Sequence, residues 1–281
     1  MGLKYAGFRL AEWLSHRLPP QAAFQCAEWI ADFQWRRSAK DREAVETNLA
    51  LVLGAHPPVG SPLVREVFRN FGRYLVEFFT FHRIQEPVIQ LEGCEALHSA
   101  TQRGRGALVL TGHVGNWEIG AAVLRRLGFA INAVALPHVH AGMDRLFNRQ
   151  RERCGVTVIP LGTHAARRSL ESLRRGQLLG ILCDREFADH GITVSFCGRD
   201  VTFPRGPAVM SARSQSPAVP TFLIREGRYA FRLYCEAPIW PPKLPISEDG
   251  IRTLTQQYAA AFERYVKRFP TQWLMFEPVV R

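Results

Sequence analysis

Apolar positions in residues 3–81 recur every three or four residues, the spacing that places them on one face of a helix. From residue 107 onward, short apolar runs rich in Val, Ile and Leu alternate with segments of helical spacing. This alternation predicts an α/β fold with a mainly parallel sheet, right-handed crossovers and flanking helices. We expect helices over residues 3–18, 21–37, 41–54 and 62–81, and strands over residues 107–110, 131–137, 156–162 and 178–184.

The last third of the chain adds antiparallel pairs and a long helix. One hairpin is predicted around residues 198–200, and a second is predicted to turn at Glu226 and Gly227. A helix with regular apolar positions is expected over about 247–269. A chain of 281 residues can form one large α/β domain or two small ones. We predict a single domain over 1–281, with a helical section over 1–90 and an α/β core over 91–281.

The first two helices carry aromatic and basic side chains that allow two interpretations. The segment 3–18 is amphipathic with Trp13 on its apolar side, and Trp29, Trp35, Arg36 and Arg37 add an aromatic and basic fringe to the next helix. Such helices can lie in a membrane interface. More commonly they pack on the rest of the protein. In the second helix, apolar residues expected to face inward include Phe24, Ile30 and Phe33.

Charge and cysteine content narrow the class of protein. The formal net charge of +11 implies an acidic partner, and the sequence shows no recognisable nucleic-acid module. The six cysteines form no C-x2-C pair, so a zinc site or a disulfide framework is not expected and a reducing compartment is favoured. Charged residues interrupt the N-terminal apolar segment, and no window is long and apolar enough for a spanning helix. We therefore expect neither a signal peptide nor a transmembrane segment.

Residues 107–128, ALVLTGHVGNWEIGAAVLRRLG, predict a strand, a turn and a helix capped by Asn116. On one continuous helix, residues five apart would lie roughly 140° apart around the axis. His113 and Glu118 can therefore meet only if His113 lies in the turn. A histidine oriented by a carboxylate is a general base. Because no Ser lies in this stretch and no G-x-S-x-G occurs in the chain, we expect the attacking hydroxyl to come from a substrate.

Other candidate residues follow the same strands. Asp184 and Arg185 end the strand over 178–184, and parallel strands bring their carboxyl ends to one edge of a sheet, where such folds bind ligands. Arg205 and Gly206 open a helix whose free amides could bind an anion. Backbone amides of residues 114–116 could stabilise an oxyanion. The simpler alternatives are a strand-end histidine, a helix-capping Glu118 and an ordinary Asp-Arg ion pair.

TGHVGNWE resembles the H-x4-D/E motif of the glycerolipid and lysophospholipid acyltransferases. Its surroundings resemble the branch that contains the bacterial late lipid A acyltransferases and the mycobacterial phosphatidylinositol mannoside acyltransferase. The similarity extends to RERCGVTVIP, which contains Arg151, to CDREF, and to the F-P-x-G-P-A style segment at residues 203–208. Gln272-Trp273 is present near the end of the chain, but the basic run that follows it in lipid A acyltransferases is not. This difference favours the broader phospholipid or glycolipid branch.

The resemblance implies specific roles. His113 would be the general base on an acceptor hydroxyl, with Glu118 as its partner. Substrate contacts would come from Asn116, Arg151, Asp184, Arg185, Arg205 and Gly206. The donor would be an acyl carrier protein or coenzyme A thioester, and the acceptor an anionic membrane lipid or glycolipid.

The same resemblance implies an O-acyltransferase without metal or bound cofactor, peripheral to the cytoplasmic face of the bacterial inner membrane. An acyl-thioester hydrolase and a non-catalytic lipid-binding protein remain the alternatives.

Overall fold

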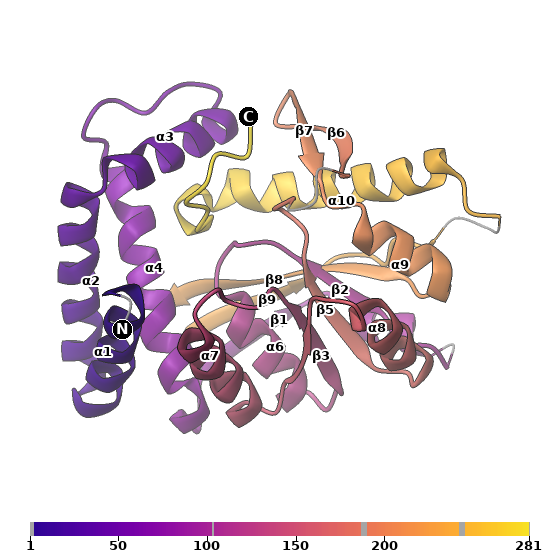
Figure 1. Cartoon of the computed structure of the whole chain (residues 1–281), viewed down its shortest axis with the longest axis horizontal. Coiled ribbons are helices and arrows are strands. Elements are labelled where there is room, and N and C mark those ends of the chain that lie inside the picture. The colour runs from indigo at the N-terminus through magenta and orange to yellow at the C-terminus, as the bar shows by residue number, and fades with distance from the viewer. Residues whose placement is uncertain (1–2, 103, 187–189, 242–244, 281) are drawn as a thin grey trace.

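The computed structural model describes residues 3–102, 104–186, 190–241 and 245–280. Four helices come first: α1 (Leu3–Arg17), α2 (Pro20–Arg37), α3 (Ala39–Leu53) and α4 (Pro62–Thr80). They gather at one end of the molecule, with α2 beside α4, and the sheet with its covering helices occupies the rest (Figure 1). These helices match the predicted segments, and α3 ends at Gly54, which takes a left-handed conformation.

A seven-stranded sheet forms the centre of the α/β part, in the order β1-β9-β8-β2-β5-β3-β4. Its strands are β1 (Val88–Glu92), β2 (Leu108–Thr111), β3 (Ile131–Ala135), β4 (Thr157–Pro160), β5 (Leu178–Leu182), β8 (Ala218–Gly227) and β9 (Ala230–Cys235). All neighbours are parallel except β8 and β9. The mainly parallel α/β fold is therefore confirmed.

Helices cover both faces of this sheet. Alternate residues of β2 point in opposite directions: Val109 packs with α5 (Glu95–Thr101) and α6 (Trp117–Arg126), whereas Leu108 and Leu110 face the other core. That second core is built with α8 (Ala165–Arg174), α9 (Gly206–Ser214) and the long α10 (Glu248–Arg268). The remaining helix, α7 (Ala141–Arg153), precedes β4.

A separate hairpin of β6 (Ile192–Phe196) and β7 (Arg199–Phe203) confirms the first predicted hairpin and packs on α10. In the second hairpin the structure differs slightly from prediction. Gly227 still pairs with Ala230, so the chain turns at Arg228 and Tyr229, and Tyr229 takes a left-handed conformation. Strand β1 and helix α5 were not predicted, because β1 is an edge strand whose mostly exposed residues give no clear apolar alternation.

The N-terminal helices are joined to one another through α4. Asp32 of α2 accepts paired hydrogen bonds from Arg65 and Arg69 of α4, and these bonds lower the pKa of Asp32 well below its usual value. Phe24 is buried as predicted, but Ile30 and Phe33 were placed wrongly: they are 51% and 61% exposed. Once α4 occupies the inner side of α2, these two side chains lie on its outer side. Of the helices in the described ranges, none is long and apolar enough to cross a bilayer.

Candidate active site

The turn between β2 and α6 holds His113, as predicted. Gly112 and Gly115 permit this tight turn, because a Cβ at Gly112 would lie 2.3 Å from the Phe262 ring and one at Gly115 would lie 1.9 Å from the Leu223 carbonyl oxygen. Asn116 caps α6 as predicted by accepting a hydrogen bond from the Ile119 amide. The predicted contact between Asn116 and substrate does not fit the position of its side chain. The Asn116 side chain is fully buried and donates to Glu77 and the Tyr74 carbonyl, so it serves packing inside the protein.

Parallel register brings His113 beside Asp184. Thr111 pairs with Leu182 across β2 and β5, and the two candidate residues each follow two positions later. The His113 Nδ1 lies 2.8 Å from the Asp184 Oδ1, and the His113 backbone amide donates to the Asp184 Oδ2 at 2.8 Å. The Trp273 indole donates to the same Oδ2 at 3.1 Å. His113 and Asp184 therefore meet at the carboxyl edge of the sheet, as predicted for residues at the ends of these parallel strands.

The surroundings of Asp184 keep it ionised. Burial alone would raise its pKa, but the His113 charge and the hydrogen bonds from His113 and Trp273 outweigh burial and lower the pKa. An ionised carboxylate only accepts hydrogen bonds, so the His113 Nδ1 carries a proton toward it. The His113 Nε2 is then the ring nitrogen available to take a proton from a substrate.

Glu118 has a different partner from the one predicted. The Arg151 guanidinium donates to both Glu118 carboxylate oxygens, at 2.9 and 2.5 Å. Both side chains are largely buried, and the pair ties the first turn of α6 to the last turn of α7. The His113 ring is therefore held by Asp184 rather than by Glu118. Sequence spacing suggested the nearer carboxylate, but the first turn of α6 directs Glu118 toward α7.

The end of the chain closes over the histidine turn. The Leu274 amide donates to the His113 carbonyl, and the Gly115 amide donates to the Gln272 carbonyl. The Asn116 amide is likewise used, by the Leu223 carbonyl. The predicted oxyanion site at residues 114–116 is thus wrong for Gly115 and Asn116, because their amides already have acceptors.

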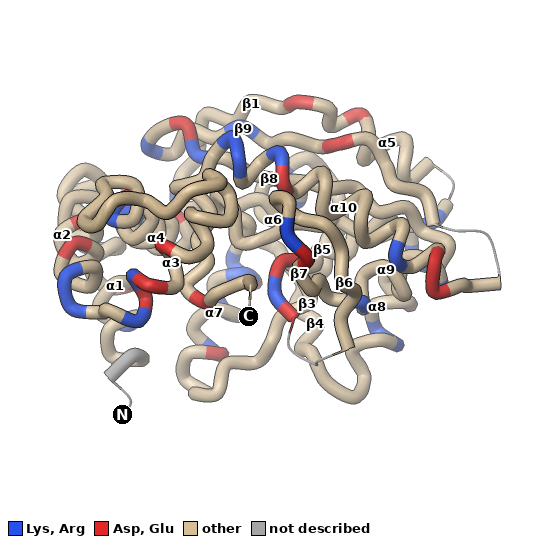
Figure 2. The backbone as a smooth tube through the Cα atoms, turned by 90° about the horizontal axis from the view of Figure 1, so that it is seen from above, with Lys and Arg blue, Asp and Glu red and all other residues tan. Residues whose placement is uncertain are grey.

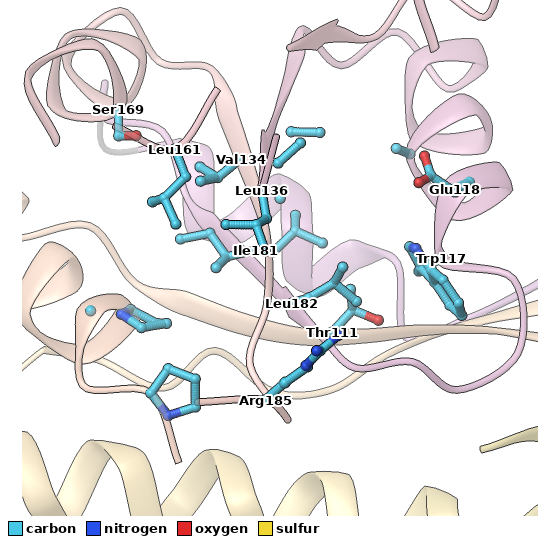
Figure 3. Close-up of a pocket in the computed structure, with 18 of the residues that line it drawn as sticks. Thr111, Trp117, Glu118, Val134, Leu136, Leu161, Ser169, Ile181, Leu182 and Arg185 are labelled. Atoms are coloured by element: carbon cyan, nitrogen blue, oxygen red, sulfur yellow. The ribbon is translucent and has the colours of Figure 1, made fainter. Parts of the chain in front are cut away.

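A cavity of about 860 Å³ opens beside this pair and is lined by His113. Most of its wall is apolar and comes from β3, β5, α6, α8 and α9, with Val134, Leu136, Ile181 and Leu182 among the side chains drawn in Figure 3. Trp117 forms the wall next to His113, with the two ring centroids 4.9 Å apart, and stacks on Tyr74. The volume and lining suit a long apolar chain whose reactive end lies near His113.

The structure brings most of the predicted residues to this cavity. His113, Glu118, Arg151, Arg185, Arg205 and Gly206 all line it, whereas Asp184 lies behind His113. Arg185 forms an ion pair with Glu277, and Arg205 pairs with Glu248 through its two terminal guanidinium nitrogens, each at 2.5 Å. No cluster of His, Cys, Asp and Glu suited to a metal ion occurs among the residues that the structure describes.

Sequence reasoning missed two parts of the site. Gln272-Trp273 is recognisable as a motif, but nothing in the sequence assigns Trp273 to the Asp184 carboxylate. Sequence reasoning also did not foresee that the apolar faces of α8 and α9 would wall the cavity, since those residues read equally well as core. No local signal distinguishes the wall of a cavity from packed core.

A histidine held by a buried carboxylate beside an apolar cavity of about 860 Å³ is a site suited to acyl transfer. The model of the bacterial lipid A biosynthesis acyltransferase family matches residues 4–281, and the chain belongs to this family. The predicted O-acyltransferase class is thereby confirmed.

The sequence is also similar to two named acyltransferases. The chain is 28% identical to the phosphatidylinositol mannoside acyltransferase of Mycobacterium tuberculosis H37Rv over 279 residues, covering 95% of this chain and 86% of the relative. It is 25% identical to the lipid A biosynthesis palmitoleoyltransferase of Escherichia coli K12, covering 84% and 77%. Among solved structures, the 1-acyl-sn-glycerophosphate acyltransferase PlsC of Thermotoga maritima matches with a TM-score of 0.43 and 16% identity, covering 89% of this chain and 99% of that one.

Proposed function

We propose that this enzyme transfers a fatty acyl group from an acyl thioester, carried by acyl carrier protein or coenzyme A, to a hydroxyl of a membrane lipid or glycolipid. The observation that carries the proposal is the placement of the His113–Asp184 pair on the wall of the apolar cavity. A glycolipid acceptor is further supported by the names of two relatives, a phosphatidylinositol mannoside acyltransferase and a lipid A biosynthesis palmitoleoyltransferase.

In the proposed step, the His113 Nε2 removes the proton of the acceptor hydroxyl while its oxygen attacks the thioester carbonyl carbon. The tetrahedral intermediate collapses with cleavage of the carbon–sulfur bond, and the protonated His113 returns the proton to the leaving sulfur. The products are an ester and a free thiol. Because a thioester is already an activated acyl donor, proton transfer suffices and the mechanism needs no metal or bound cofactor.

The polar residues at the cavity are assigned to the polar ends of the substrates. Arg185, Arg205 and Gly206 line the cavity and would contact a phosphate of the donor or acceptor. Glu118 and Arg151 would act together as a fixed ion pair that shapes the wall beside His113. Asp184 would position the base rather than touch substrate.

The test is acyl transfer by purified protein, with labelled acyl carrier protein and acyl-CoA offered against a panel of phospholipid and glycolipid acceptors. Acceptor-dependent formation of an acyl ester is expected. Release of free fatty acid at the same rate with or without acceptor would instead identify a hydrolase. Lipid binding without any turnover would identify a non-catalytic binder and overturn the proposal.

We also infer that the enzyme works as a peripheral protein at the cytoplasmic face of the inner membrane, where thioesters and lipid acceptors meet. Support comes from exposed apolar residues of α1 and α2, namely Leu10, Trp13, Trp29, Ile30 and Phe33. The same helices and the start of α3 also carry exposed basic residues, namely Arg17, Arg36, Arg37 and Lys40. Aromatic and basic groups together favour an anionic bilayer surface.

Replacing both Trp29 and Phe33 by alanine is expected to weaken binding to anionic phospholipid vesicles by about 10-fold or more, because two exposed aromatics would no longer enter the interface. Vesicle co-sedimentation measures the effect. Val88→Ala with Leu91→Ala is the matched control, since these residues are also exposed but lie on edge strand β1. Equal losses in the two double variants would contradict a membrane surface on α2.

A further inference from the structure

Helix α8 has two contrasting sides. Ala165, Ala166, Ser169 and Leu170 line the apolar cavity. The solvent side of the helix and its C-cap carry exposed arginines: Arg167, Arg168, Arg174 and Arg175. Lys and Arg positions are marked on α8 in Figure 2. One short helix therefore separates the cavity from a basic surface.

Helix α8 itself carries one acidic residue, Glu171. The closest approach of Arg167 to Glu171 is 4.0 Å, and the Arg167 side chain remains 72% exposed. Arg213, on the neighbouring α9, is exposed and also lines the cavity, so the basic surface continues to the cavity wall. We call these residues, Arg167, Arg168, Arg174, Arg175 and Arg213, the α8 basic surface.

We propose that the α8 basic surface docks an acidic carrier protein that delivers the acyl group as a thioester on a phosphopantetheine arm. This inference rests on the proposed acyl transfer and names the donor. An acidic partner is complementary to the arginines, and Arg213 stands where the phosphate of the arm would pass toward the cavity. The acyl chain would then enter a cavity whose wall is the other side of the docking helix.

Two observations favour a protein over a bilayer at this surface. Helix α8, as the structure describes it, exposes no large apolar side chain, whereas α1 and α2 expose several. Helices α1 and α2 also lie at the opposite end of the long axis of the molecule from α8 and α9 (Figure 1). A carrier could therefore dock at α8 while the N-terminal helices contact a membrane.

The test compares two donors with the charge-reversed double variant Arg167→Glu, Arg174→Glu. With acyl carrier protein as donor, the KM is expected to rise about 10-fold or more at low salt, while kcat changes less than about twofold, because charged surfaces chiefly control encounter. With acyl-pantetheine, which lacks both the protein and the phosphate, KM is expected to stay within about twofold. The charge-retaining variant Arg167→Lys, Arg174→Lys should keep most of the wild-type KM for the carrier.

Arg145→Glu with Arg149→Glu on α7 is the matched control, because both residues are exposed and the change in net charge is the same. An equal KM rise for the carrier in this control would overturn a specific site on α8. An unchanged KM for the carrier in the charge-reversed α8 variant would also overturn the proposal. So would a variant in which only vesicle binding is lost. Absence of transfer from either donor by the wild type would instead refute the proposed function, so the two failures are distinguishable.

Discussion

Replacing His113 by alanine is expected to lower kcat for acyl transfer by about 10⁴-fold, because the variant lacks the group that accepts the hydroxyl proton. The Asp184 carboxylate that remains is buried behind the missing ring and cannot reach a substrate in the cavity. The measurement is single-turnover acyl transfer with a labelled thioester donor and saturating acceptor. Thermal unfolding should confirm that the variant stays folded.

His138→Ala is the matched control, since His138 also lines the cavity, where burial lowers its pKa. We expect the control to retain kcat within about 10-fold, because its contribution would be packing rather than proton transfer. If both variants lost the same activity, a specific role for His113 as base would be refuted. Near-normal turnover in His113→Ala would refute it more directly.

The strand, turn and helix around His113 could be predicted because each signal is local. An apolar run forms β2, Asn116 caps α6, and the residues between them must turn. The partner of the histidine could not be predicted in the same way. Asp184 is 71 residues away, and it meets His113 only through the register of β2 against β5. The sequence predicts that the two strands end at the same edge of the sheet. It does not predict that Thr111 pairs with Leu182, and this pairing is what places His113 and Asp184, each two positions later, within hydrogen-bond distance.

The outward position of Ile30 and Phe33 shows a second limit of prediction from sequence. Helical periodicity identifies an apolar stripe on α2, but it does not say how wide a stripe the partner helix covers. Helix α4 covers only part of α2, and the uncovered part is the surface that we assign to the membrane. The cavity is subject to the same limit, since wall residues such as Ile181 have the composition of core.

Replacing Asp184 by asparagine is expected to lower kcat by roughly 10²–10⁴-fold while leaving KM for the donor nearly unchanged. Three groups in the described part of the chain donate hydrogen bonds to Asp184: the His113 amide, the His113 ring and the Trp273 indole. An asparagine must present its NH₂ group to some of these donors, which favours the ring tautomer with the proton on Nε2. That tautomer cannot accept a proton from the acceptor hydroxyl. Steady-state kinetics and the pH dependence of kcat measure the effect.

The variant Glu118→Gln tests whether Glu118 or Asp184 orients the His113 ring. It leaves the Asp184 contact intact but removes the charge that neutralises buried Arg151, so we expect a lower melting temperature and a loss of roughly 3–5 kcal/mol of stability. At a temperature where this variant is folded, its kcat should exceed that of Asp184→Asn by at least about 10-fold. The reverse order would mean that Glu118 reaches the ring during turnover and that the arrangement seen here changes when substrate binds. The expected order would instead assign orientation of the base to Asp184 and support of its surrounding wall to the Glu118–Arg151 pair.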